Sequence, residues 1–392
     1  MEVKPGYKQT EIGVFPEEWD VEKLRELVTI RSGDSPSNYM LKITGIPFFK
    51  VDQLNNSNKY QKDTPYYIDV KNPIPAGSIV FPKRGAAIFM NKIRILNQDS
   101  YFDTNIMSVS TNHKIYNELL YYILTFIDIS TLADTTSVPQ INNKHIYPFF
   151  IAYPPALKEQ MLISGHLSDI DSLITSLEKL IEKKKLIKQG VMQELLTGKR
   201  RLPGFRREWE TKRLGDVSVV IMGQSPDSKY YNTDSKGIPL IQGNADIQNG
   251  KSVSRIWTKS ITKECQKGAI LITVRAPVGS VGISSSRACL GRGVCAVQPY
   301  SVNERYLYWQ LKFSEDKWNE SQQGSTFTSV NSNQIKDFCI LCPTSFDEQA
   351  AIADVIEDIE IEIDLHIKQL NKQILLKQAM MQELLTGRIR LI

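Results

Sequence analysis

The sequence predicts an α+β protein in which two globular domains with pseudo-twofold symmetry are joined by two long antiparallel coiled-coil helices. The first observation is a long repeat. Residues 188–202 (KQGVMQELLTGKRRL) and 377–391 (KQAMMQELLTGRIRL) share 11 of 15 residues at an offset of 189, in a chain of 392. The second is a heptad spacing of apolar residues before both of these segments. The third is a region of short β-rich runs and turns that precedes each helix.

The repeat extends along the whole chain. The segment at 15–37 faces 205–228, which pairs Trp19 with Trp209 and one GxSP motif with another. IPFFKVD (46–52) faces IPLIQGN (238–244), and IPAGSIVFPKRG (74–85) faces ECQKGAILITVRA (264–276), with Arg84 opposite Arg275. A period this long predicts a domain plus an extension in each copy. We therefore divide the chain into a first domain (1–155), a central helix (156–202), a second domain (203–344) and a C-terminal helix (345–392).

The two helices follow from apolar spacing and from the lack of helix breakers. No proline occurs from Ala156 to Thr197, and the apolar spacing of 4,3,4,3,4 is that of a coiled-coil seam. Gly198 and Gly387 stand where helix-ending glycines belong, and Thr344 or Ser345 could cap the second helix. We expect the seams to pair antiparallel; the alternative is an amphipathic helix in an ordinary core. The seam residues are Ile163, Leu167, Ile170, Ile174, Leu177 and Ile181, then Ile352, Ile356, Ile359, Ile363, His366 and Leu370.

Composition limits the class of protein. The chain is too long for one ordinary core, and 41% hydrophobic with 23% charged residues is typical of globular proteins. The start has no signal-peptide pattern, and no apolar run approaches the roughly 20 residues of a membrane span. Five cysteines, all after position 264, form no disulfide framework, so we expect a cytoplasmic protein with no membrane partner.

Charge and side-chain chemistry point to nucleic acid. The net charge is +5, and residues 203–344 have 18 Lys or Arg against 12 Asp or Glu, whereas residues 1–155 have 16 of each. A basic surface could contact nucleic acid or could simply be solvated. Arg, Lys, Asn and Gln contact base edges, although each candidate could also be an ordinary surface residue. The candidates are Lys50, Lys83, Arg84 and Arg94 in the first copy and Gln224, Gln242, Asn244, Arg275 and Arg292 in the second.

The globular copies should contain strands at 78–81, 102–109, 269–274 and 279–283 and helices at 117–127 and 303–312. The helices carry Tyr121, Tyr122, Tyr306, Tyr308 and Trp309. We find no G-x-G-x-x-G, P-loop or G-x-S-x-G motif and predict no active site. Cys339-x-x-Cys342 could bind a metal or be redox-active, but Phe150 and Tyr153 occupy the matching positions of the first copy. Packing is therefore the simpler interpretation of this pair.

The ordered repeat resembles the specificity (S) subunit of type I restriction–modification systems. The resemblance rests on the paired W…L…GxSP starts, on NNKHIYPFFIAYPP and NSNQIKDFCILCP before the helices, and on MQELLTG at both helix ends. It implies two target-recognition domains that each read one half of a split double-stranded DNA site, with the helices setting the distance between them. It also implies no catalysis and no cofactor in this chain, because S-adenosylmethionine and the catalytic motif belong to the modification (M) subunits.

The resemblance further implies partner subunits. Two M subunits would dock on the helices, and restriction (R) subunits would join them. The docking positions that we assign lie in the repeated helix ends: Gln193, Glu194, Leu195 and Leu196, then Gln382, Glu383, Leu384 and Leu385. One alternative is a coiled-coil scaffold that displays two β-rich modules without DNA specificity. A stand-alone DNA methyltransferase or nuclease is a second alternative, against which the missing catalytic motifs argue.

Overall fold

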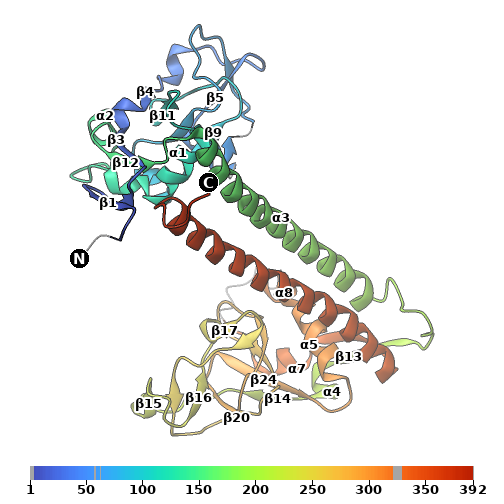
Figure 1. Cartoon of the computed structure of the whole chain (residues 1–392). Helices are drawn as coiled ribbons and strands as arrows, with labels where there is room; N and C mark the ends of the chain where they lie inside the picture. The colour runs from blue at the N-terminus through green and yellow to red at the C-terminus, as the bar shows by residue number, and fades with distance from the viewer. Residues whose placement is uncertain (1–3, 57–58, 62, 321–328, 392) are drawn as a thin grey trace. The chain divides into compact units, whose positions relative to one another are not determined.

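Each of the two long helices contributes to two compact units. In this computed structural model, which describes residues 4–56, 59–61, 63–320 and 329–391, the first unit comprises residues 1–178 and 369–392 and the second comprises 179–368. Helix α3 (Leu157–Leu196) begins in the first unit and ends in the second, and α8 (Phe346–Leu384) begins in the second and ends in the first (Figure 1). Each unit therefore contains one globular domain, the start of one long helix and the end of the other. The four-segment division remains a prediction.

In the part of the first unit that the structure describes, two larger sheets are accompanied by two two-stranded sheets and two shorter α-helices. The larger sheet has the order β4 (Val28–Ser32), β11 (Ile106–Thr111), β8 (Ile79–Pro82), β9 (Arg94–Leu96) and β6 (Tyr60–Gln61), and the smaller has β10 (Tyr101–Phe102), β5 (Ile46–Phe49) and β7 (Tyr67–Ile68). A hairpin, β1 (Tyr7–Thr10) and β2 (Gly13–Pro16), precedes β3 (Asp20–Lys23), which pairs with β12 (Phe150–Tyr153). The helices are α1 (Asn117–Phe126) and α2 (Asn143–Ile146).

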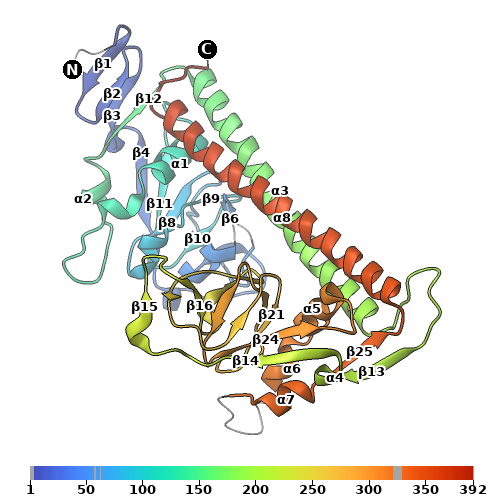
Figure 2. The same ribbon diagram turned by 90° about the horizontal axis from the view of Figure 1, so that it is seen from below.

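The second unit repeats this strand order and adds strands at the sheet edges. Its larger sheet has the order β14 (Ser218–Met222), β24 (Val294–Pro299), β21 (Ile270–Thr273), β22 (Val281–Ile283), β18 (Lys251–Ser252) and β17 (Ile247–Gln248). The smaller sheet has the order β15 (Tyr231–Asn232), β19 (Trp257–Thr258), β16 (Ile238–Ile241), β23 (Ala288–Leu290) and β20 (Glu264–Cys265). β13 (Trp209–Arg213) pairs with β25 (Cys339–Pro343), and the shorter helices are α4 (Leu214–Val217), α5 (Glu304–Phe313), α6 (Glu315–Glu320) and α7 (Ser332–Lys336) (Figure 2).

Each large sheet is buried on both faces. Along β8, Ile79 and Phe81 belong to the core shared with α1 and the long helices, whereas Val80 belongs to the core shared with the small sheet. Along β21, Ile270 and Leu271 divide in the same way. Successive side chains of a strand point to opposite faces, so a continuous apolar run is what a doubly covered strand requires. The predicted strands at 78–81, 269–274 and 279–283 are confirmed, as are the helices at 117–127 and 303–312.

The ends of the long helices confirm the predicted caps. Gly198 and Gly387 both have φ of +69°, a left-handed conformation that favours glycine. Both close the helix in the same way, with N–H groups at 198 and 387 bonded to the carbonyls of Leu195 and Leu384. Ser345 caps α8, since its Oγ accepts a hydrogen bond from the N–H of Glu348 at 3.4 Å.

Ion pairs join the two long helices within each unit, and the order of Lys184–Glu362 and Lys188–Glu360 in the second unit shows that the helices run antiparallel. In the first unit Lys377 of α8 contacts Asp171 of α3 at 2.6 Å. In the second Lys188 of α3 contacts Glu360 of α8 at 2.6 Å. Lys188 is equivalent to Lys377 and Glu360 is equivalent to Asp171, because the two equivalent positions are 189 residues apart in each case. The same contact between the helices therefore occurs once in each unit. All twelve predicted seam residues are buried or half-buried.

One predicted strand needs correction, and the structure places the aromatic residues of the short helices. The run at 102–109 is two strands rather than one, because the chain turns at Asp103, whose carboxylate accepts the N–H of Asn105 at 2.8 Å. The aromatic residues of α1 and α5 are core residues and present no surface for stacking bases, as Tyr122 and Tyr306 are fully buried. Cys339 is exposed and Cys342 is buried, which fits opposite faces of strand β25. Among the described helices, none is long and apolar enough to cross a membrane.

Candidate nucleic-acid interface

The same strand end supplies a candidate site in each unit. β5 lies parallel to β10, and β16 lies parallel to β23. The first residue after β5 is Lys50, whose backbone N–H donates to Oε1 of Gln53 at 2.7 Å. The first residue after β16 is Gln242, whose N–H donates to Oδ2 of Asp246 at 2.7 Å. A side chain further along the chain thus fixes the backbone at both positions.

The repeated GxSP motifs run beside these strand ends. A Cβ atom on Gly33 would lie 2.2 Å from the carbonyl oxygens of Phe102 and Asp103, and one on Gly223 would lie 2.1 Å from that of Gly291. Only glycine permits backbones to approach so closely. The motif therefore has a structural function, and the exposed Gln224 that follows Gly223 is presented next to the strand end.

In the first unit, two of the predicted residues, Lys50 and Lys83, lie near the buried carboxylate of Asp103. Lys50 lies over the ring of Tyr66 at 4.0 Å. Burial, followed by the charge of Arg84, lowers the pKa of Lys83. Burial raises the pKa of Asp103, while the charge of Lys50 acts in the opposite direction. Lys50 and Lys83 therefore both interact with Asp103, as does the acidic Asp52, and the exposed Arg84 follows Lys83 in the sequence.

Arg94 has a different environment. Burial lowers the pKa of its guanidinium, and the neighbouring ionisable group is Tyr121 of α1. Its Nε is buried and has no hydrogen-bond partner within the described ranges. Arg94 is thus placed against α1, where base contact is unfavourable, whereas Lys50, Lys83 and Arg84 remain candidates for it.

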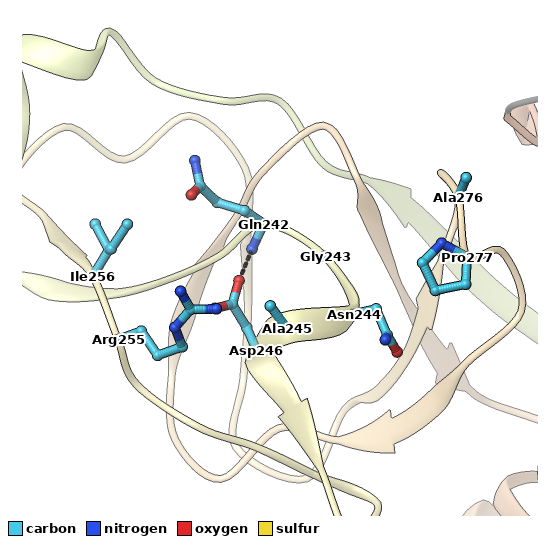
Figure 3. A pocket seen from close by; sticks show the side chains of 9 residues that line it. All are labelled: Gln242, Gly243, Asn244, Ala245, Asp246, Arg255, Ile256, Ala276 and Pro277. Carbon is cyan, nitrogen blue, oxygen red and sulfur yellow. Dashed lines mark hydrogen bonds and ion pairs between the residues drawn. The ribbon is translucent and has the colours of Figure 1, made fainter. Parts of the chain in front are cut away.

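In the second unit two of the five predicted residues, Gln242 and Asn244, line a pocket of about 450 Å³. Figure 3 shows Gln242 and Asn244 on its wall, with Ala276 and Pro277, which follow the exposed Arg275. The backbone of Arg275 pairs with Ser329, as that of Arg84 pairs with Gln140. Arg292 is exposed next to Gly291 and donates its N–H to Oγ of Ser225 at 3.0 Å. The wall of the pocket consists of Gln242, Gly243, Asn244, Ala245, Asp246, Arg255, Ile256, Ala276 and Pro277.

The sequence prediction missed two residues of this pocket, Asp246 and Arg255. Asp246 is buried, and Arg255 lies 3.6 Å from it, measured from Nη1 to Oδ1. The strand pairing shows why the repeat did not reveal Arg255. Leu240 bonds to the carbonyl of Ile256 as Phe48 bonds to that of Tyr66, so the counterpart of Arg255 in the first unit is Pro65. No repeated signal in the sequence could have found it.

The predicted docking residues divide by burial. Leu195 and Leu196 belong to the core of the second unit, and Leu384 and Leu385 belong to that of the first. Burial in these cores argues against direct contact between the four leucines and a partner, so this part of the docking prediction has no support from the structure. Gln193 and Glu194 are exposed and Gln382 and Glu383 are half-exposed, and only these four polar residues remain candidates.

The fold and the site define a duplicated protein: two units of related topology present different polar side chains at the same strand end. The chain belongs to the family of the type I restriction modification DNA specificity domain, which matches residues 16–189 and 206–376. It is a specificity subunit and not an enzyme.

Known relatives match nearly the full length. The chain is 29% identical over 417 residues to the "Putative type I restriction enzyme MjaX specificity subunit" of Methanocaldococcus jannaschii, which covers 98% of this chain and 97% of the relative. The crystal structure of the type I restriction–modification S subunit from M. genitalium superposes with a TM-score of 0.65 at 14% identity, covering 98% of each chain. A structure described as the basis of complex assembly and conformational transition of the type I R-M system has a TM-score of 0.65 at 21% identity, covering 96% of this chain and 99% of the other.

Proposed function

We propose that this specificity subunit reads a bipartite double-stranded DNA target, with one unit contacting each half-site, within a complex that contains two M subunits and R subunits. The observation that supports this proposal is the repeated strand-end site with exchanged side chains. Arg84 and Arg275 are equivalent, but Lys50 in one unit stands opposite Gln242 in the other. An arginine or lysine suits guanine and a glutamine suits adenine, so equivalent sites with different side chains are suited to different half-sites.

The charge of the first domain favours a shared DNA interface. Its 16 acidic residues balance its 16 basic ones, whereas affinity for DNA depends on neutralised phosphates. The M subunits would then supply most phosphate contacts as well as S-adenosylmethionine. The complex would act in the cytoplasm.

An exposed apolar pair, present once in each unit, is the docking surface that we propose for the M subunits. Leu186 and Ile187 of α3 are 60% and 42% exposed, and Leu375 and Leu376 of α8, each 189 residues later, are 65% and 46% exposed. Exposed apolar groups at equivalent helix positions fit two copies of one partner, because each copy can make the same contact.

Subunit stoichiometry tests the docking surface. Leu375→Ser with Leu376→Ser should give a complex with one M subunit for each chain instead of two, measured by native mass spectrometry. Leu173→Ser is a matched control, because Leu173 is 42% exposed on α3 but its counterpart is Glu362 and it belongs to no repeated pair. Two bound M subunits in the double variant would contradict the assignment.

Methylation-site sequencing tests the reading of a split target. Host DNA from cells with and without the gene should differ at one bipartite motif. Inserting one heptad after Lys179 and one after Lys368 keeps the heptad phase of both helices and adds roughly 10 Å, about three base pairs of DNA. We expect the half-sites to stay the same and the gap to lengthen. An active variant with an unchanged gap contradicts the distance-setting role of the helices. Binding of the complex to DNA without sequence preference would favour the scaffold alternative.

A further inference from the structure

We propose that Arg255, oriented by Asp246, reads a guanine edge in the half-site bound by the second unit. This inference rests on the proposed function, because it names a base contact of the same complex. It adds a specificity-determining residue that has no counterpart in the first unit, where Pro65 stands at the equivalent position.

The carboxylate of Asp246 is held in place before any ligand binds. Asp246 is 6% exposed and lies in the short 3-10 turn Asn244–Asp246 that follows β16. Oδ2 accepts the N–H of Gln242 at 2.7 Å, and Oδ1 lies 3.6 Å from Nη1 of Arg255. Figure 3 shows the guanidinium of Arg255 beside this carboxylate. A buried, hydrogen-bonded acid thus limits where the guanidinium can point.

The guanidinium remains accessible in that position. The side chain of Arg255 is 52% exposed, and a guanidinium has five N–H donors, of which this ion pair engages one nitrogen. The neighbouring Gly243 leaves space at the wall, since a Cβ atom there would meet nothing within 4 Å. A base edge can therefore approach the backbone between Gln242 and Asn244, next to free donors of Arg255.

The chemistry of the pair favours a base over a phosphate. The charge of Asp246 offsets that of Arg255, which weakens attraction to a phosphate and places an anion close to where the phosphate would lie. The neutral pair keeps its directional donors, and guanine offers the O6 and N7 acceptors that arginine contacts bidentately. The flanking amides of Gln242 and Asn244 have the same base-edge chemistry.

The test uses the complex with its M subunits and methylation-site sequencing. The wild-type motif should contain guanine in one half-site. Arg255→Ala should reduce discrimination at that one position roughly ten- to hundredfold and leave the other half-site and the gap unchanged. Asp246→Asn keeps an acceptor for the N–H of Gln242 but removes the charge, so it should relax the same position by less, with an unchanged melting temperature.

Arg287→Ala is the matched control. Arg287 is also 52% exposed and pairs with a carboxylate, that of Glu264 at 2.6 Å. Arg287 lies directly before β23, whereas the pocket lies at the other end of the parallel strands β16 and β23. Removing its side chain should therefore leave the methylated DNA motif unchanged.

Each remaining outcome overturns the inference. A wild-type bipartite motif without guanine in either half-site excludes the contact. An unchanged motif in Arg255→Ala excludes it as well. Uniformly weaker methylation with a salt slope reduced by about one would identify a phosphate contact. If the wild-type complex shows no bipartite motif at all, the proposed function itself fails, and that result is distinct from a bipartite motif that Arg255→Ala leaves intact.

Discussion

Removing the guanidinium of Arg201 should destabilise the second unit far more than a neighbouring arginine does. Arg201 follows α3 and holds the carboxylate of Glu348, near the start of α8, with Nε to Oε1 at 2.6 Å and Nη2 to Oε2 at 2.7 Å. Glu348 is fully buried and also accepts Nε1–H of Trp209 at 3.3 Å. Arg201→Ala would leave a buried carboxylate without its counter-charge.

The magnitude follows from burial. Breaking a fully buried pair from one side costs about 3–5 kcal/mol. The side chain of Arg201 is 30% exposed, so water can partly replace it and we expect a loss of about 2–3 kcal/mol. For a unit of this size, about 2–4 °C per kcal/mol converts the loss into a fall in melting temperature of roughly 4–12 °C.

Scanning calorimetry of the full chain measures this fall, and hydrogen exchange locates it in the second unit. Arg200→Ala is the control, because Arg200 pairs with Glu194 at 3.3 Å on the surface, with both side chains more than half exposed; such pairs contribute about 0–1 kcal/mol. Adding Glu348→Gln to Arg201→Ala should restore part of the stability, since no buried charge then remains. If Arg201→Ala melts within about 2 °C of Arg200→Ala, the reasoning from burial is refuted.

Three further predictions concern single positions. Gly387→Ala should lower the stability of the protein by more than about 1 kcal/mol, because the φ of Gly387 is +69° and a Cβ atom there would lie 2.5 Å from Pro16. Gly190→Ala should instead add about 0.5–1 kcal/mol, because Gly190 lies inside α3 with open space around it. Equal melting temperatures of the two variants would contradict this prediction. Burial raises the pKa of Asp103, so its contribution to stability is present below the unfolded pKa and is lost as pH rises through the folded pKa. Asp103→Asn should therefore melt no lower than wild type at pH 7, and any advantage should disappear in acid. Arg84→Ala and Arg275→Ala should each relax one half-site by about 1–3 kcal/mol in methylation-site sequencing, and an effect of one variant on both half-sites would contradict separate reading.

The repeated helix ends are explained by contacts inside each unit. Arg390 holds Glu159 in the first unit, with Nε to Oε1 at 2.6 Å, as Arg201 holds Glu348 in the second. Glu159 lies in the first turn of α3, and Glu348 lies in the first turn of α8. The arginine that binds each glutamate follows the C-terminal end of the opposite long helix. Identical residues recur 189 positions apart because each copy must make this same intramolecular contact. The resemblance had assigned the identity to partner docking, and the buried leucines of both ends argue against that explanation.

The sequence by itself determined the architecture of this protein. A 189-residue offset, a heptad seam and helix-ending glycines at 198 and 387 depend on local spacing and backbone conformation, and these are encoded along the chain. They were sufficient for the α+β class, both long helices and most strands tested above. The equivalence of Arg84 and Arg275 also followed from the repeat alone.

Only the tertiary structure decided which side chains remain available. Whether Leu195 packs in a core, Arg94 lies against α1 or Asp246 comes within 3.6 Å of Arg255 depends on strand pairing and packing between distant segments. Arg255 belongs to a segment whose counterpart is Pro65, so the repeat has no information about it. A side chain without an equivalent in the other copy can be located only once strand pairing brings its segment to the strand end, because the contact is made between residues distant in the sequence.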